Sequence, residues 1–155
     1  MYPHPEGQSG FNYPLGGLLQ VKGVVTEAEL RNPTQLDANG EECILVVKNG
    51  KTTGTTMGRV TGIESVVREY DKDGLEKTSL EVGVYPYSHK DGAFSAAGDS
   101  GSIVVTGEGR VVGLLTSGSG TTEYNDVTYV TPYFWLEERV KKVFPSCFLY
   151  PTVDF

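Results

Sequence analysis

Cysteine, basic charge and long apolar runs are scarce in this sequence, and each scarcity excludes a class of protein. Cys43 and Cys147 are the only cysteines and form no CxxC pair, which argues against a disulfide framework. No apolar run reaches the length of about 18 residues that a membrane-spanning helix needs, so no membrane association is expected. Lys and Arg number 13 against 20 Asp and Glu, and the net charge of −7 repels phosphate. Nucleic acid is therefore not expected as a partner.

Patterns for cofactors and for export are also missing. Neither a phosphate-binding glycine loop nor a cluster with metal-ligand spacing occurs, so we expect no cofactor and no metal. The first residues, Met1 to Pro5, contain neither the basic nor the apolar stretch of a signal peptide. Together with the missing disulfide framework, this predicts a cytoplasmic location. Secretion stays an alternative if the sequence is truncated at its N terminus.

Glycine, by contrast, is abundant, with 20 among 155 residues, nearly twice its usual share of about 7%. Such a composition is typical of a β-rich chain with many turns. The sequence predicts strands over residues 43–48, 51–70, 75–87, 102–106, 110–116 and 127–131. Asn49-Gly50 is expected to form a two-residue turn between the first two of these strands. Gly54, Gly58 and Gly62 are expected to mark bulges or bends in the second strand.

Helical signals occur near both ends of this run of strands. Residues 27–31 favour one helical turn that stops before Pro33. At the other end, Thr131 suits an N-cap and Pro132 the first helical position. The following apolar residues recur on one helical face: Leu136, Val140, Val143 and Phe144. We expect the helix to carry Trp135 on a face that packs in the core.

One segment has the composition of a catalytic loop, Gly98-Asp99-Ser100-Gly101-Ser102, directly before the strand at 102–106. A serine is a weak nucleophile unless a base accepts its proton. The flanking glycines allow the backbone to turn, so that the N–H groups of Gly98 and Ser100 could bind a developing oxyanion. The alternative is a glycine-rich hairpin turn with a solvated Asp99 and Ser100.

Four segments in a fixed order support the catalytic alternative: residues 47–60, 94–102, 110–116 and 126–132. In this order the sequence resembles the second β-barrel of trypsin-like serine proteases of the chymotrypsin fold, and most of all fungal trypsin-like proteins. The resemblance covers about residues 15–150. It implies an all-β fold, a six-stranded antiparallel Greek-key barrel with an N-terminal arm and a C-terminal helix. The expected division is an arm and bridging strand at 1–42, the barrel with its helix at 43–150, and a tail at 151–155.

The resemblance also implies roles for the residues of the loop. Ser100 would be the nucleophile, and the backbone amides of Gly98 and Ser100 would form the oxyanion hole. Asp99 would make a buried polar contact that holds this hole open.

Substrate-binding residues follow from the same resemblance. Thr116, Ser117 and Gly118 would form the strand edge that pairs with an extended peptide or protein substrate. Phe94 falls where the family has the floor of its specificity pocket, and a phenylalanine there argues against selection for Lys or Arg. The alternative for Phe94 is packing in the core.

A base for the serine is missing. The histidines are His4 and His89, and the resemblance gives neither a catalytic role. In the family, the histidine and aspartate of the triad come from a first barrel upstream, and the segment before Cys43 is too short for one. The chain is therefore either the C-terminal half of a serine endopeptidase, with the first barrel or another chain as its partner, or a non-catalytic half-protease scaffold that binds a protein. A pair of identical copies is a third alternative.

Overall fold

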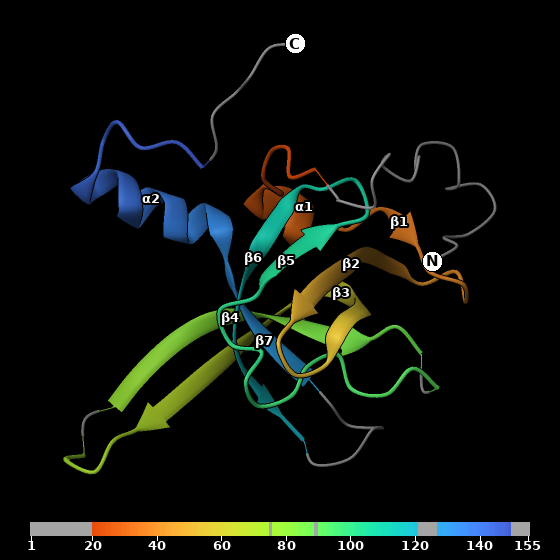
Figure 1. Cartoon of the computed structure of the whole chain (residues 1–155), viewed down its shortest axis with the longest axis horizontal. Helices are drawn as coiled ribbons and strands as arrows, with labels where there is room; N and C mark the ends of the chain where they lie inside the picture. Colours follow the sequence, from red (N-terminus) through yellow and green to blue (C-terminus); the bar gives the residue numbers. More distant parts are fainter. Residues whose placement is uncertain (1–19, 75, 89, 121–126, 150–155) are drawn as a thin grey trace.

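The computed structural model describes residues 20–74, 76–88, 90–120 and 127–149 (Figure 1). Within these residues the elements follow the order α1 (Glu27–Arg31), β1 (Gln35–Leu36), β2 (Glu42–Gly50), β3 (Gly54–Tyr70), β4 (Glu76–Pro86), β5 (Ile103–Thr106), β6 (Val111–Ser119), β7 (Val127–Pro132) and α2 (Tyr133–Val143). The strands therefore occur close to the predicted positions. Neither of the two described helices is long and apolar enough to cross a bilayer.

Six of the strands close into a ring. The strand order is β1-β2-β3-β4-β7-β6-β5, and an additional pairing between β2 and β5 joins the two ends. All neighbouring strands are antiparallel, and the short β1 adds to β2 outside the ring. This confirms the predicted six-stranded barrel followed by a helix. The connection from β4 to β5 joins strands that are not neighbours, and it carries residues 98–102.

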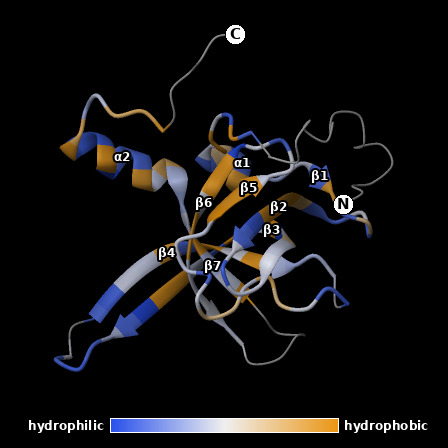
Figure 2. Cartoon of the chain, in the orientation of Figure 1, coloured by the Kyte–Doolittle hydropathy of each residue, from blue (hydrophilic) through white to orange (hydrophobic). Residues whose placement is uncertain are grey.

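The core of the ring is built from valines. Each of the six strands contributes one valine with no exposed surface: Val46, Val60, Val84, Val104, Val112 and Val130. β-branched side chains suit a pleated, buried surface, which explains why these segments form strands. In Figure 2 the hydrophobic colour concentrates where the strands cross, whereas the tip of the β3–β4 hairpin is hydrophilic.

The helix α1 is fixed to the ring by one acidic residue. Glu29 forms a capping box with Thr26, whose hydroxyl accepts a hydrogen bond from the Glu29 N–H at 3.3 Å. The Glu29 carboxylate also accepts hydrogen bonds from the two terminal guanidinium nitrogens of Arg110, at 2.7 Å each. Leu30 of the same helix joins the core cluster. The predicted helical turn is confirmed, and it packs against the barrel.

The turn between β2 and β3 differs from the prediction. Asn49 and Gly50 lie within β2, Gly50 pairs with Gly54, and the turn consists of residues 51–53. The two-residue turn was therefore wrong, because Gly50 is needed elsewhere, beside a buried carboxylate described below. The bulge at Gly62 is confirmed, since the β3–β4 register shifts between residues 60 and 64.

The helix α2 corrects two further predictions. It begins at Tyr133 with Pro132 as the N-cap, one residue later than expected, and no side-chain hydrogen bond caps it. None of its residues is buried, and Trp135 is 41% exposed. The expected core face is therefore wrong for this helix. Phe134 in its first turn packs against the core, and the rest of α2 projects away from the ring (Figure 1).

Candidate active site

The loop between β4 and β5 buries one residue between two exposed ones. Asp99 has no exposed surface, whereas Gly98 and Ser100 on either side are exposed. The backbone at Gly98 has φ +100°, a conformation that favours glycine. This turn directs the Asp99 side chain into the barrel and leaves its neighbours at the surface.

The Asp99 carboxylate is saturated with hydrogen-bond donors. One oxygen, Oδ1, accepts from the backbone N–H groups of Thr52 at 2.7 Å and Thr53 at 3.3 Å. The other oxygen, Oδ2, accepts from the Thr53 hydroxyl at 2.6 Å and from the Ala96 N–H at 3.1 Å. Lys48 Nζ lies 3.2 Å from the same Oδ2. Burial by itself would raise the pKa of Asp99, but the donors from Thr53, Thr52 and Ala96 outweigh it and hold the pKa well below its ordinary value.

Two glycines make room for this arrangement. A Cβ at Gly50 would lie 2.4 Å from Asp99 Oδ1, so the strand can pass the carboxylate only without a side chain. A Cβ at Gly98 would lie 2.5 Å from the Thr52 hydroxyl oxygen, which itself donates to the Ala97 carbonyl at 2.8 Å. The β2–β3 turn and the loop around Asp99 therefore form one packed unit, which explains the Asn-Gly-Lys-Thr-Thr-Gly segment at 49–54.

The backbone N–H groups of the loop fall into two classes. The Asp99 N–H donates to the Ala96 carbonyl at 3.1 Å, and the Gly101 N–H donates to a carbonyl of β6 at 2.7 Å. The N–H groups of Gly98 and Ser100 have no acceptor within the part of the chain that the structure describes. Two uncommitted donors therefore flank the buried aspartate, at the positions predicted for an oxyanion hole.

The Ser100 hydroxyl lies at the surface next to these donors. It donates to the Thr116 carbonyl of β6 at 3.2 Å, and a peptide carbonyl is no base. His4 and His89 both lie outside the described residues. Across the described ranges no group of metal-ligating side chains occurs either. The described residues thus present a serine and two donors without a proton acceptor.

The predicted substrate edge is the end of β6. This strand extends beyond β5, so Ser117 and Gly118 pair with β7 and have no strand on their other side among the described residues. Thr116 lies in a register shift between β6 and β7, and its hydroxyl donates to the Tyr129 carbonyl at 3.1 Å. An extended peptide can add to such an edge.

Phe94 lies in the barrel core rather than at the surface. It is 1% exposed and belongs to the core cluster, and a Cβ at Gly58 would lie 2.8 Å from its ring. The structure favours the packing alternative for this residue, and contact with substrate stays a prediction. The next residue, Ser95, shares a 2.6 Å hydrogen bond with the buried Thr128 hydroxyl.

Sequence reasoning missed Lys48, Thr52 and Thr53 as parts of this site. A signal for Lys48 was present, because a lysine directly follows the apolar run Ile44–Val47 and so falls within a core strand. The partner of a lysine at that place could not be derived from the local pattern.

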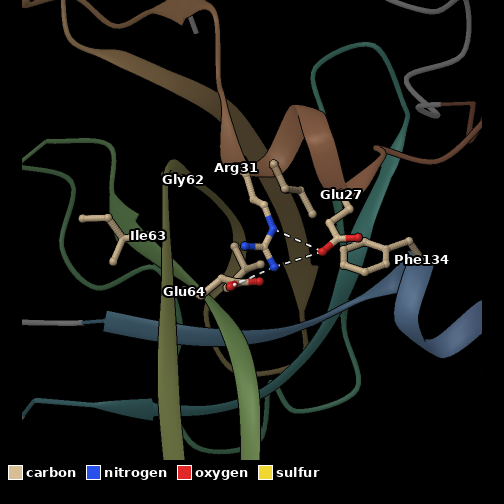
Figure 3. A pocket seen from close by; sticks show the side chains of 8 residues that line it. Glu27, Arg31, Gly62, Ile63, Glu64 and Phe134 are labelled. Carbon is tan, nitrogen blue, oxygen red and sulfur yellow. Dashed lines mark hydrogen bonds and ion pairs between the residues drawn. The ribbon is translucent and has the colours of Figure 1, made fainter.

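A small hollow elsewhere on the molecule is shown in Figure 3. It is lined by Glu27, Leu30, Arg31, Gly62, Ile63, Glu64, Val82 and Phe134. Arg31 spans it, with ion pairs of 2.9 Å to Glu27 and 3.2 Å to Glu64. None of these residues belongs to the Asp99 loop or to the end of β6, so the hollow is separate from the candidate site.

Comparison with known proteins supports the fold described above. The ring of six strands and the C-terminal helix match half of a chymotrypsin fold. Among solved structures, the chain is similar to a chymotrypsin from Cellulomonas bogoriensis, with a TM-score of 0.50 and 21% sequence identity. The match covers 86% of this chain and 57% of that one, so the chain spans little more than half of its length. No family model and no curated protein matches.

Proposed function

We propose that this chain is the nucleophile-bearing half of a serine endopeptidase. The observation that carries the proposal is the exposed Ser100 hydroxyl beside two backbone N–H groups, of Gly98 and Ser100, that have no acceptor among the described residues. Donors held ready for a developing oxyanion contribute more to acyl transfer than donors that must first reorganise. The likeness to a chymotrypsin fold supports this class of reaction.

In this proposal Ser100 Oγ attacks the carbonyl carbon of a peptide bond. The hydroxyl proton passes to a histidine supplied by a first barrel, and the carbonyl oxygen becomes an oxyanion bound by the amides of Gly98 and Ser100. Collapse of the tetrahedral intermediate breaks the C–N bond, and the amine leaves with the proton. Water then hydrolyses the acyl ester and restores the serine. The strand edge at 116–118 holds the substrate in an extended conformation.

The test is labelling by a fluorophosphonate, applied to the native protein purified from its source. Mass spectrometry is expected to find the phosphonyl group on Ser100, because the probe needs an activated hydroxyl. S100A should abolish labelling, whereas S119A, which removes another exposed hydroxyl of the same region, should leave it unchanged. Labelling that persists in S100A, or the absence of any labelling, would refute the proposal.

A second candidate function is a non-catalytic half-protease scaffold that binds a protein partner. The observation that favours it is an apolar face at the end of α2, where Val140, Val143 and the C-cap residue Phe144 are 45%, 69% and 63% exposed. Exposed apolar faces of this kind are typical of interaction surfaces. Light scattering after size exclusion discriminates, because a chain that stays monomeric, alone and in the presence of cell extract, would count against a scaffold.

A further inference from the structure

The hairpin of β3 and β4 continues beyond the ring of strands (Figure 1). The pairing of β3 with β2 ends at Val60, whereas its pairing with β4 continues to Tyr70. On the other side of the hairpin, β4 pairs with β7 only over residues 82–84. Within the residues that the structure describes, the outer part of the hairpin is therefore a two-stranded ribbon. Such a ribbon is marginally stable in water, and further strands over an apolar face stabilise it.

One face of this ribbon is apolar and exposed. Val66 and Leu80 lie directly opposite each other in the register, and they are 61% and 57% exposed. Tyr70 lies on the same face of β3 and is 68% exposed. Toward the ring, the next pair on this face is Glu64 with Val82, and both residues line the hollow of Figure 3. Because Val82 belongs to the core cluster, the exposed face is an outward continuation of the core.

The charges along β3 are arranged symmetrically about Val66. Glu64 precedes it by two residues and Arg68 follows it by two, so all three lie on the same face of the strand. Arg31 pairs with one oxygen of Glu64, Oε2, at 3.2 Å. Arg68 pairs with Glu76 through Nε, at 3.4 Å. Across the described ranges, the other Glu64 oxygen and the terminal Arg68 nitrogens form no ion pair, and they can bind a second partner.

We propose that β3 pairs with β3 of a second copy of this chain, antiparallel and centred on Val66. A two-fold axis at this residue places Glu64 of each copy opposite Arg68 of the other. The two pairs of Val66 and Leu80 then join into one apolar stripe across four strands, in the order β4-β3-β3-β4. Unlike charges and apolar side chains at opposed positions stabilise a sheet. The inference goes beyond the proposed function and does not depend on the reaction at Ser100.

Other pairings of the hairpin lack this match. An axis at Val67 places Val66 opposite Arg68, and an axis at Arg68 places two arginines together. The edge of β4 is less open, because Glu81 is 6% exposed and accepts a hydrogen bond from the Thr131 hydroxyl of β7 at 2.7 Å. The order of unlike charges on β3 therefore favours a second copy over a strand of unrelated sequence.

Sedimentation equilibrium of the full chain tests the pairing. The measurement is made in about 0.15 M salt, which screens the long-range repulsion between two copies of charge −7. With rising concentration, the measured mass is expected to approach twice the chain mass of 16.8 kDa. Because a short strand pairing buries little area, the dimer should be weak, with a dissociation constant in the micromolar range. A chain that stays monomeric up to roughly 1 mM would overturn the inference.

Two single variants break the charge match and complement each other. E64R places positive groups opposite each other and R68E places negative ones, so each should weaken its own dimer by about tenfold. Mixed in equal amounts, the two variants regain unlike charges at both positions and should form a mixed dimer nearly as tight as that of the parent. Mixing does not restore the pairs with Arg31 and Glu76 inside each copy, so the recovery reports contact between copies. Unweakened dimers of both variants, or a mixture of folded variants that stays monomeric, would overturn the inference.

R139E is the matched control for these variants. It changes the net charge by as much as R68E does, at an exposed arginine of α2, and it should leave the dimer intact. Loss of the dimer in R139E but not in R68E would place the contact at α2 and overturn the inference. If a charge variant of β3 does not fold, V66K decides, because it places two ammonium groups at the axis from a side chain that the monomer exposes. A V66K dimer as tight as that of the parent would contradict the pairing.

Discussion

The Asp99 loop and the helix α2 differ in how well their side chains are buried and paired. Every oxygen of the Asp99 carboxylate has donors from the chain itself, and its charge has a buried partner in Lys48. At the C-terminal end of α2, by contrast, Val140 and Val143 are 45% and 69% exposed, and no residue of the helix is buried. A short helix is marginal in water unless its apolar face packs against something.

The two regions differ in how far the described residues supply their contacts. The buried carboxylate of the Asp99 loop finds all its partners in the ring, in the β2–β3 turn and in the loop itself, so the geometry of this loop is a property of the barrel. The apolar residues Val140 and Val143 of α2, by contrast, are exposed in the part of the chain that the structure describes.

Substitution of the buried aspartate tests the loop most severely. D99N retains the shape of the side chain but leaves the Lys48 ammonium buried without an anion. It also replaces one accepting oxygen by an NH2 group, which faces donors of the chain. We expect the free energy of unfolding to fall by about 3–5 kcal/mol, the cost of breaking a buried ion pair on one side. Urea unfolding measures it. The matched D91N, at an exposed aspartate that accepts from the Ser88 hydroxyl, should change it by less than about 0.5 kcal/mol. Equal losses in both variants would contradict the account.

A methyl group at Gly50 tests the packing of the same unit. G50A places a Cβ where Asp99 Oδ1 lies 2.4 Å away, so the turn or the carboxylate must move. We expect a loss of about 1–3 kcal/mol in thermal or urea unfolding, as for overpacked cores. G83A is the control, because a Cβ at that strand glycine meets its nearest atom at 3.5 Å. A larger loss in G83A than in G50A would show that the contact does not constrain the loop.

The Glu29–Arg110 ion pair, which fixes α1 to the ring, is only partly exposed and so lies between the buried Asp99 loop and the exposed end of α2. The hydrogen bonds from Arg110 and Thr26 lower the pKa of Glu29 to about 2, whereas glutamates of the unfolded chain titrate near 4.3. The stabilisation is therefore complete above about pH 5 and is lost as the pH falls toward 2. Because the Glu29 side chain is 44% exposed, solvent screens the pair.

We expect E29Q to be less stable than the parent by on the order of 1 kcal/mol at pH 7. The difference should disappear near pH 2, and unfolding midpoints measured across this range check it. A stability difference that stays constant with pH would exclude the Glu29–Arg110 ion pair as its cause.

The smallest effect is expected on α2. V143A shortens an apolar side chain that is 69% exposed, and the free energy of unfolding of the chain should change by less than about 0.5 kcal/mol. V112A makes the same change at a valine with no exposed surface and should cost roughly 1–3 kcal/mol. If V143A costs as much as V112A, the helix is covered in solution by part of this chain or by a second copy.

The strands could be predicted because their signal is local. β-branched alternation is present in each strand, and the Gly62 bulge follows from a glycine inside such a run. The Gly98–Ser102 loop could likewise be found from its composition. Closure of β2 on β5 could not be derived from any short window, since it joins segments that are far apart in the sequence. For the same reason the partner of Lys48 was not predicted.

Two errors have a physical cause of the same kind. The Asn49-Gly50 turn was expected from local propensity, but the contact of Gly50 with Asp99 overrides that propensity. The face of α2 was expected in the core because its periodicity is helical. Periodicity shows that an apolar face exists and does not show what covers it.

Hydrogen exchange at three consecutive amides tests most directly whether the loop presents two free donors around a buried aspartate. We expect slow exchange at the Asp99 N–H, which is bonded to the Ala96 carbonyl, and fast exchange at Gly98 and Ser100. Protection of Gly98 or Ser100 together with fast exchange at Asp99 would show that the loop is turned the other way and that no oxyanion hole exists.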